Sequence, residues 1–414
     1  MTTAKRRLDV PWLREGALAG VLAALDRDSE EARVVGGAVR NALLGEPLED
    51  FDIATTALPQ EVVRRVDAAG FKAVPTGIEH GTVTVVADGR GFEVTTLRED
   101  VETYGRHAKV AFGRDWRRDS ERRDFTMNAL FLARDGTIYD YVGGLADIER
   151  RRVRFIGDAS RRIGEDYLRI LRFFRFHAAY GHGGLPDPEG VHACIVARAG
   201  LETLSRERVR AEMLKLVLAR HAVPTIAVMT EAGILDMVLG GVPLLASLSN
   251  MIKLEARLSL APDPVRRLGA LGVFVVEDAE RLRERLRLAN AEYERLASMA
   301  QAWWRVTAGL SERDARAAIY RLGPERYLDR VLLAWSRAPE GAADRSWHAL
   351  ATLPARWSAP VFPLKAADFI ARGVERGPQL GAALRAAEAA WIAAGFPGDR
   401  ATLSEIAEAA VAGS

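Results

Sequence analysis

The sequence predicts an α/β domain over residues 1–150 followed by an all-α remainder. Before residue 150, short apolar runs punctuated by glycine alternate with helical segments such as residues 61–69, a pattern typical of α/β domains. After the basic run at residues 150–154, apolar side chains recur almost only at helical spacing. A chain of 414 residues is long enough for two or more compact units.

Paired glycines near the start of the α/β domain predict a turn that approaches an anion. Val34 and Val35 have the composition of a buried strand end, and residues 38–44 that of a helix. Gly36 and Gly37 lie between them and let a ligand reach the backbone, because neither carries a Cβ. A helix start behind such a turn offers unbonded N–H groups to a phosphate.

Two carboxylates follow, Asp50 and Asp52, separated by Phe51. In an extended segment both side chains project to the same side, because side chains alternate along a strand. Such a pair can bind one or two Mg²⁺ ions. A phosphate site next to a metal site indicates nucleotidyl transfer, in which the protein mainly positions charges. The alternative is a strand-to-helix turn followed by an acidic loop.

The stretch from Gly36 to Gly45, together with Asp50 and Asp52, resembles the opening motif of the class II tRNA nucleotidyltransferases, the CCA-adding enzymes, and of the related bacterial poly(A) polymerases. Four further blocks follow in that family's order. They are similar to its ribose-reading motif (residues 122–130), its head-to-neck turn (140–148), its nucleotide-selecting helix (165–176) and the helix start that braces that helix (205–212). These blocks are distributed from about residue 34 to residue 212, a stretch of about half of the chain.

The resemblance implies a nucleotidyltransferase head, with a mixed sheet and helices, over residues 1–150. It implies a helical neck for nucleotide selection (151–220), a helical body (221–350) and a helical tail that contacts tRNA (351–414). The implied reaction is metal-dependent, untemplated addition of C, C and A to tRNA 3′ ends from CTP and ATP, with release of pyrophosphate. The alternatives are a poly(A) polymerase, an enzyme that adds only CC or only A, and a non-catalytic RNA-binding protein on this fold.

The matched positions also imply roles for individual residues. Asp50 and Asp52 are the expected ligands of two Mg²⁺ ions. Gly37 and Arg40 are expected at the triphosphate, Arg123 near the sugar or phosphate, and Asp124 or Asn128 at the ribose hydroxyl. The full set of implied nucleotide-binding residues is Gly36, Gly37, Arg40, Arg123, Asp124, Asn128, Asp166, Arg169, Arg172 and Arg175.

The chain departs from the family pattern in two places. Asn41 stands where the family often has Asp, and Tyr104 stands where the segment before residue 122 often has Asp. The polar loop at residues 98–118, with glycines at 105 and 113, is the candidate for a rearrangement between the C and A additions.

The nucleotide-selecting helix also has a physical interpretation of its own. A helical projection separates an apolar face from a face that binds, with Tyr167, Ile170, Leu171 and Phe174 on the first and Asp166, Arg169, Arg172 and Phe173 on the second. A carboxylate acceptor and a guanidinium donor fit the amine and ring nitrogen that cytosine and adenine share, and oppose uracil and guanine. Asp166 and Arg169 are therefore predicted to act as a protein template. The alternative is an ordinary surface ion pair.

A third acid, Glu93, lies in a predicted hairpin. Residues 82–86 and 92–97 have strand composition, and Asp88-Gly89 between them is a turn signal. Glu93 is the only acid in the second strand and is a candidate third metal ligand. The alternatives are that it fixes a neighbouring arginine or lies in solvent at a sheet edge.

Helical patterns dominate the rest of the chain. They predict helices at residues 277–306, 311–322, 325–335 and 378–394, and prolines at 354, 360 and 363 mark a break before the tail. Trp303, Trp304, Trp335 and Trp347 are expected in helix-packing core, with RNA stacking as the alternative.

Charge and cysteine content agree with a phosphate-rich partner and a reducing compartment. The net charge is +2, but residues 106–176 hold 17 Lys or Arg against 11 Asp or Glu. We expect tRNA, CTP and ATP as partners, with no membrane and no evident protein partner. Cys194 is the only cysteine, so an intrachain disulfide is excluded. No signal peptide or membrane span is predicted, and a cytoplasmic location is expected.

Overall fold

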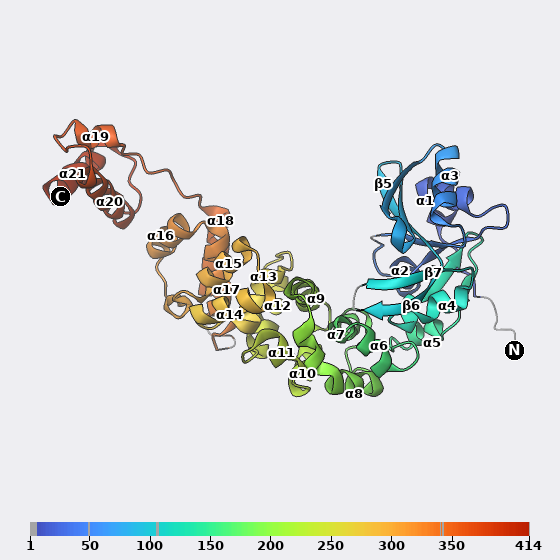
Figure 1. The fold of residues 1–414 in the computed structure, drawn as a ribbon. Helices are drawn as coiled ribbons and strands as arrows, with labels where there is room; N and C mark the ends of the chain where they lie inside the picture. Colours follow the sequence, from blue (N-terminus) through green and yellow to red (C-terminus); the bar gives the residue numbers. More distant parts are fainter. Residues whose placement is uncertain (1–5, 49, 105–106, 340, 342, 414) are drawn as a thin grey trace. The chain divides into compact units, whose positions relative to one another are not determined.

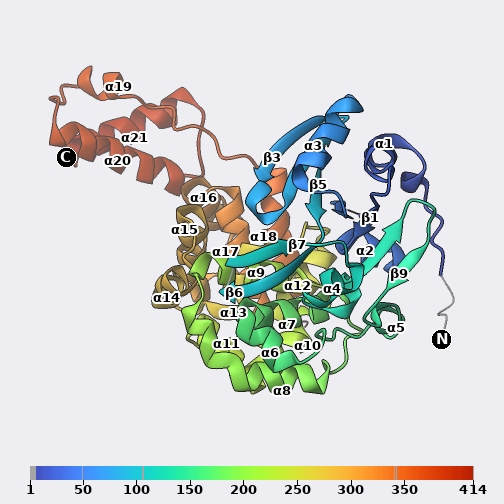
Figure 2. The same ribbon diagram turned by 45° about the vertical axis from the view of Figure 1, so that its right-hand side comes forward.

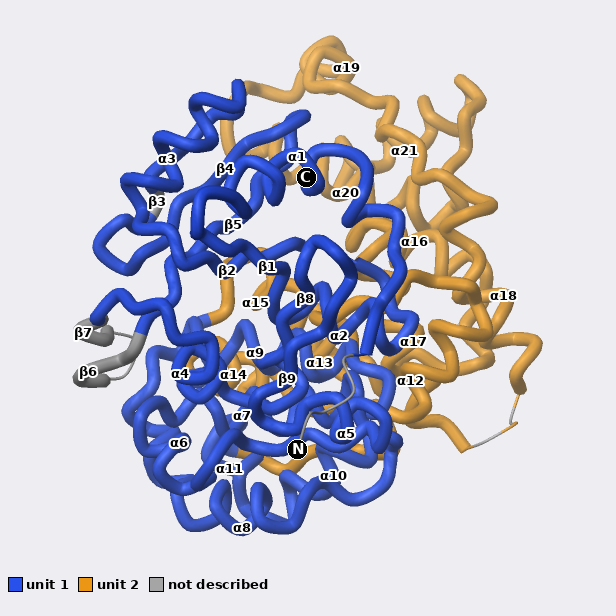
Figure 3. The backbone as a smooth tube through the Cα atoms, turned by 90° about the vertical axis from the view of Figure 1, so that its right-hand side faces the viewer, with its two compact units in different colours: residues 1–240, 285–287 blue, residues 241–284, 288–414 orange. Residues whose placement is uncertain are grey.

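The structure is a computed structural model that describes residues 6–48, 50–104, 107–339, 341 and 343–413, with only the backbone described at residues 76 and 99–110. The chain divides into two compact units (Figure 3). Unit 1 contains residues 1–240 and 285–287, and unit 2 contains residues 241–284 and 288–414. The functional division at residues 150, 220 and 350 stays a prediction.

Unit 1 begins with a mixed seven-stranded sheet (Figure 1). Its strands are β1 (Ala32–Val35), β2 (Asp52–Thr55), β3 (Lys72–Gly77), β4 (Thr82–Ala87), β5 (Arg90–Thr96), β8 (Leu130–Ala133) and β9 (Ile138–Asp140). The order in space is β3-β4-β5-β2-β1-β8-β9. Only the β2–β5 pair is parallel; the other neighbours are antiparallel. The predicted mixed sheet is confirmed.

The predicted hairpin is β4 and β5. Side chains along β4 alternate between half-buried and buried, as expected for a strand with one face on the core. Asp88 and Gly89 in the turn have φ of 50° and 74°, the left-handed region that tight hairpin turns require and that Asp and Gly tolerate. The turn chemistry seen in the sequence thus fixes this register.

Helices cover the sheet of unit 1. They are α1 (Gly16–Leu25), α2 (Gly37–Leu44), α3 (Pro59–Ala68), α4 (Trp116–Glu121) and α5 (Gly144–Glu149). Helix α2 contacts β1 and β8, while α1 and α3 contact each other and β4. Helix α3 begins with Pro59, whose fixed φ suits the first helical position, and ends near Gly70 at φ 81°.

Residues 98–118 are not a loop over most of their length. They contain β6 (Arg98–Tyr104), β7 (His107–Phe112) and the start of α4. Strands β6 and β7 pair antiparallel as a separate two-stranded sheet, which Figure 2 draws as neighbouring arrows. The loop prediction is wrong here because backbone pairing between the two segments overrides their polar composition.

Helices complete unit 1. They are α6 (Ala159–Glu165), α7 (Leu168–Tyr180), α8 (Pro188–Ala197), α9 (Arg206–Leu218), α10 (Ala222–Glu231) and α11 (Ile234–Leu239). Helix α7 packs against α9 and α10. Buried phenylalanines join α7 to the sheet domain, because Phe125 lies 5.1 Å from both Phe155 and Phe176, centroid to centroid. An apolar joint of this kind holds α7 at a fixed place beside the sheet domain.

Unit 2 is helical in its described residues. Its helices are α12 (Leu245–Arg257), α13 (Pro264–Gly272), α14 (Val276–Leu286), α15 (Asn290–Ala300), α16 (Glu312–Leu322), α17 (Pro324–Ser336), α18 (Asp344–Arg356), α19 (Ala366–Ile370), α20 (Pro378–Ala393) and α21 (Arg400–Ala412), with the end of α14 counted in unit 1. The single helix predicted over residues 277–306 is wrong. Arg287 has φ 48° and ends α14, which no amphipathic pattern reveals.

The four tryptophans divide between core and surface. Trp335 and Trp347 are buried and stack with centroids 6.3 Å apart, as predicted for core residues. Trp304 is 54% exposed, and Trp303 is half-buried and donates its indole N–H to the carbonyl of Phe274 at 2.8 Å. The core prediction is therefore wrong for Trp304, because a turn starting at Ala302 lifts the pair off the helix.

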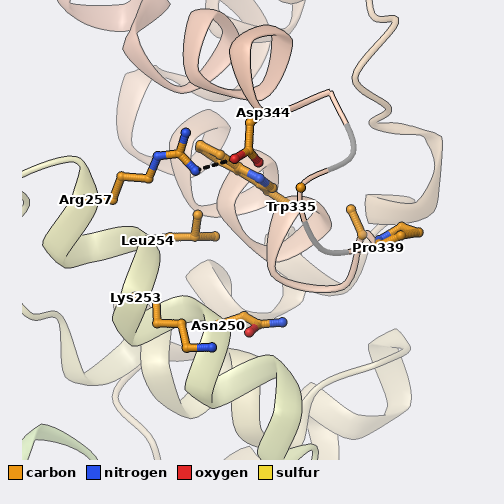
Figure 4. A pocket seen from close by; sticks show the side chains of 9 residues that line it. Asn250, Lys253, Leu254, Arg257, Trp335, Pro339 and Asp344 are labelled. Carbon is orange, nitrogen blue, oxygen red and sulfur yellow. Dashed lines mark hydrogen bonds and ion pairs between the residues drawn. The ribbon is translucent and has the colours of Figure 1, made fainter.

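One pocket of unit 2, with a volume of about 220 Å³, lies between α12 and the segment joining α17 to α18 (Figure 4). Arg257 donates to Asp344 across it at 2.7 Å, and Lys253 and Asn250 also line it. None of the predicted site residues borders this pocket.

Among the helices that the structure describes, none combines the length and apolar character needed to cross a bilayer.

Candidate active site

The glycine turn lies directly beside the first predicted acid. Gly36 has φ 74° and ψ −125°, a conformation that only glycine adopts without strain, and α2 begins at Gly37. A Cβ at Gly36 would lie 3.9 Å from Asp52 Oδ2 and 3.9 Å from Arg123 Nη1. The turn, one carboxylate and one guanidinium therefore share one corner of the sheet.

The acids that were predicted as metal ligands gather at the start of β2. Asp52 is the first residue of β2 and pairs in register with Glu93 on parallel β5, so the two side chains lie on the same face. Asp50 precedes the strand, and all three residues are exposed. Within the described part of the chain, their carboxylates form no hydrogen bond or ion pair.

The electrostatics of this corner favour a cation. Loss of hydration raises the pKa of Asp52 above its ordinary value, and the nearby charges of Glu93 and Asp50 raise it further, while Arg123 opposes them. Negative charge of this kind is relieved by a bound cation.

These residues fit Mg²⁺. The described residues contain no group of three or more His, Cys, Asp or Glu that could enclose a metal on their own. Mg²⁺ commonly takes one or two carboxylates and completes its shell with substrate phosphates and water, which suits the Asp50 and Asp52 pair.

Arg123 is held in place from behind. Its Nη2 donates to Asp119 Oδ2 at 3.0 Å, and Asp119 is buried and also accepts from Arg122. Burial alone would raise the pKa of Asp119, but the two guanidinium groups hold it below its ordinary value. Arg123 keeps its Nη1 side toward Gly36 and Asp52, and its expected contact with a sugar or phosphate stays a prediction.

Asp124 and Asn128 lie at the centre of a polar network next to α7. Asp124 Oδ2 accepts from Arg172 Nη2 at 2.5 Å, and Oδ1 accepts from Asn128 Nδ2 at 3.0 Å. Burial alone would raise the pKa of Asp124, but the Arg172 charge and these hydrogen bonds hold it below its ordinary value. Asp124 is thus an oriented, ionised acceptor, which is compatible with its predicted role at a ribose hydroxyl.

Arg40 does not lie open toward a triphosphate. It is 6% exposed and donates to Asn128 Oδ1 at 2.6 Å, to Asn41 Oδ1 at 2.8 Å and to the Tyr180 hydroxyl at 2.7 Å. Asn41 in turn donates to the carbonyl of Pro47 at 2.7 Å. Most of the guanidinium donors of Arg40 are thus used inside the protein, and the expected contact between Arg40 and a phosphate stays a prediction.

Asp166 and Arg169 are near each other in sequence but not on one regular helix. Asp166 is the extended residue that ends α6, and α7 begins at Leu168. Asp166 Oδ2 accepts from Arg208 at 2.5 Å, whereas Arg169 donates to Glu165 at 2.5 Å. The continuous helical projection is therefore wrong at Asp166.

The two faces assigned to α7 are also corrected in part. Phe173 is fully buried against Phe155 rather than on an open face. Arg175 donates to the buried Glu212 of α9, as Arg172 does to Asp124. The three arginines predicted to face a nucleotide follow one another at spacings of three residues along α7, and each is paired with a carboxylate.

A cavity of about 330 Å³ lies beside Asp166, bordered by Glu165, Tyr167, Thr203 and Arg208. Sequence reasoning missed the partners Glu165, Arg208, Glu212 and Tyr180. The first three lie inside the recognised blocks and could have been found from their charge. Tyr180 lies outside every block, and no local signal marks it.

The fold and this corner define a nucleotidyltransferase of the poly(A) polymerase head type. A family model described as Poly A polymerase head domain matches residues 32–154, and one described as Probable RNA and SrmB- binding site of polymerase A matches residues 187–248.

Individual relatives narrow the class. The chain is 35% identical over 384 residues to the mitochondrial CCA tRNA nucleotidyltransferase 1 of Danio rerio, covering 90% of this chain and 86% of that protein. It is 42% identical over 207 residues to the CCA-adding enzyme of Leuconostoc citreum (strain KM20), half of each chain. The crystal structure of the Bacillus stearothermophilus CCA-adding enzyme in complex with CTP superimposes with a TM-score of 0.75 at 28% identity, covering 97% and 98% of the two chains. The chain belongs to the CCA-adding tRNA nucleotidyltransferase family, whose members are generally metal-dependent enzymes.

Proposed function

We propose that this protein adds C, C and A in turn to tRNA 3′ ends, from CTP and ATP, at the corner formed by Gly36, Asp50 and Asp52. The single observation that supports this assignment most directly is the pair of exposed carboxylates of Asp50 and Asp52, unpaired among the described residues, with Asp52 beside a glycine turn and Arg123. A non-catalytic RNA-binding protein has no need for such a costly arrangement of like charges.

In this proposal Asp50 and Asp52 hold two Mg²⁺ ions, and Glu93, the candidate third ligand, contributes to the same negative field. Bound Mg²⁺ lowers the pKa of the attacking 3′-hydroxyl and neutralises the pyrophosphate that leaves. The backbone of Gly36 and Gly37 approaches the triphosphate, and Arg123 contacts the sugar or phosphate. Asp124, fixed by Arg172 and Asn128, accepts from the ribose hydroxyl.

Base selection is proposed for Asp166 and Arg169. Arg208 orients the Asp166 carboxylate, and Glu165 orients the Arg169 guanidinium. A rigid acceptor and a rigid donor discriminate between bases because the wrong base leaves buried polar groups unpaired. In this proposal Arg172 and Arg175 contact the nucleotide and keep their hydrogen bonds to Asp124 and Glu212.

The body and tail, residues 221–350 and 351–414, are proposed to hold the tRNA acceptor arm mainly through phosphates and shape, as double-helical RNA requires. A cytoplasmic location also stays a proposal, since relatives include proteins named mitochondrial. Cell fractionation tests it.

The test uses purified protein and tRNA that lacks its last three nucleotides, with each labelled triphosphate supplied separately and in combination. Successive incorporation of C, C and A, stopping after A, is the expected result. Repeated A addition identifies a poly(A) polymerase, and arrest after CC, or addition of A only to tRNA that already ends in CC, identifies a partial enzyme. No incorporation in the presence of Mg²⁺ contradicts the proposal.

A further inference from the structure

Tyr180, the last residue of α7, contacts the helix behind the glycine turn. Its hydroxyl accepts a hydrogen bond from Arg40 Nη2 at 2.7 Å, and the Arg40 guanidinium carbon lies 3.9 Å from the centre of its ring. The same residue therefore provides both a hydrogen-bond acceptor and an aromatic face for one buried cation.

Arg40 transmits this contact to the turn. It lies in the first turn of α2, its backbone N–H donates to the Gly36 carbonyl at 3.1 Å, and its Nη2 would lie 3.7 Å from a Cβ at Gly37. The guanidinium thus packs beneath the glycine turn. Because Arg40 is buried and charged, its position depends on every acceptor that it has.

The other end of α7 is tied to the same network. Arg40 donates to Asn128, Asn128 donates to Asp124, and Asp124 accepts from Arg172. Arg172, Phe176 and Tyr180 follow one another at spacings of four residues, so they form one stripe along α7. Phe176 lies in the middle of the stripe, with the guanidinium carbons of Arg40 and Arg172 each 5.2 Å from its ring centre.

We propose that Tyr180 is a positioning residue that keeps the glycine turn and α7 at one fixed spacing through Arg40. A nucleotide whose phosphates lie at the turn and whose base lies at α7 then presents its α-phosphate to Asp50 and Asp52 in a single geometry. This inference rests on the proposed function, since it needs the two ends of one nucleotide to be held by the two elements.

Loss of the Tyr180 hydroxyl loosens this spacing and leaves the binding groups themselves in place. In Tyr180→Phe, kcat for C addition should fall about tenfold, because small misplacements of reacting groups cost large factors in rate. KM for CTP should stay within about twofold and the preference for CTP over UTP should be unchanged, since Asp166 and Arg169 are untouched. Tyr180→Leu, which also removes the ring, should lower kcat further.

Tyr141→Phe is the matched control. The Tyr141 hydroxyl also accepts from a buried arginine, Arg33 Nη1 at 3.1 Å, but this pair joins β1 to the residue after β9. Its kcat should stay within about twofold of wild type, because the pair does not join the turn to α7.

The measurement is single-turnover and steady-state incorporation on tRNA ending in one C, with melting temperatures of all variants. Unchanged kcat in both Tyr180 variants overturns the inference, and so do equal losses of kcat in Tyr180→Phe and Tyr141→Phe. In either case the proposed function still stands if the wild-type protein is active. A wild-type protein that incorporates nothing overturns both.

Discussion

Unit 1 contains two groups of carboxylates in opposite electrostatic situations. Asp50, Asp52 and Glu93 are exposed and, among the described residues, unpaired. Asp124, Asp166 and Glu212 each accept from an arginine, two of them on α7 and one on α9. The first group carries negative charge that no arginine among the described residues pairs with, and each acid of the second group is neutralised by its arginine.

This difference separates two tasks that the same residue type can perform. An unpaired acid is costly to the free protein and remains available to a cation. A paired acid has a fixed orientation and serves as a directional acceptor, or as a brace between helices. The two groups should therefore respond differently to substitution and to pH.

The largest effect is expected for the unpaired acids. Asp50→Ala or Asp52→Ala should lower incorporation of both C and A by at least about a thousandfold, because one metal site serves every addition. The affinity for tRNA should stay within a few-fold of wild type, since the proposed function assigns RNA binding to the body and tail. Single-turnover rates and filter binding measure the two quantities. A variant with near wild-type rate in Mg²⁺ would refute the metal assignment.

The next effect concerns folding. Glu212→Gln should lower the free energy of unfolding by about 3 kcal/mol, because it leaves the Arg175 charge beside a neutral partner in a buried place. Glu93→Gln is the control and should change this free energy by less than about 0.5 kcal/mol. Denaturant titration of the metal-free protein measures both. Equal losses of unfolding free energy in the two variants would show that the paired and the unpaired acids do not differ in their effect on stability.

A smaller effect is expected in nucleotide choice. Asp166→Ala should raise incorporation of UTP or GTP relative to CTP by about tenfold, because the acceptor that opposes their carbonyl is removed. Arg208→Ala should shift the choice in the same direction by less, since Asp166 remains but loses its partner. Competition between labelled triphosphates gives the ratios. A parallel fall for all four triphosphates would make Asp166 a supporting residue only.

The smallest effect follows from the raised pKa of Asp52. A folded-state pKa above the unfolded value means that the folded protein binds the proton more tightly, so stability falls as pH rises through that interval. Asp52→Asn should therefore raise the melting temperature of the metal-free protein at neutral pH, by on the order of 1 °C.

The same pKa shift predicts the pH dependence of metal binding. As pH falls through the raised pKa, the proton competes with Mg²⁺ at Asp52 and the apparent metal affinity of the wild type should decrease. Thermal melts with and without Mg²⁺ across this range check both statements. A lower melting temperature for metal-free Asp52→Asn would contradict a raised pKa at Asp52.

Elements that depend on local chemistry could be predicted from the sequence. The glycine turn and the Asp88-Gly89 hairpin follow from backbone freedom and side-chain alternation within a few residues. The change from strands to helices after residue 150 follows from apolar periodicity. The resemblance of five ordered blocks added the class of reaction, which the comparisons bear out.

Which charged side chains lie next to each other depends on the fold and not on local sequence. Asp166 and Arg208 are 42 residues apart and Arg40 and Tyr180 are 140 apart, so no helical or strand period relates them. Side-chain composition shows that acids and arginines are present but does not assign partners. The fold also determines burial: it encloses Arg40 with three side chains, whereas Asp52 at the strand start has no hydrogen-bond or ion-pair partner among the described residues.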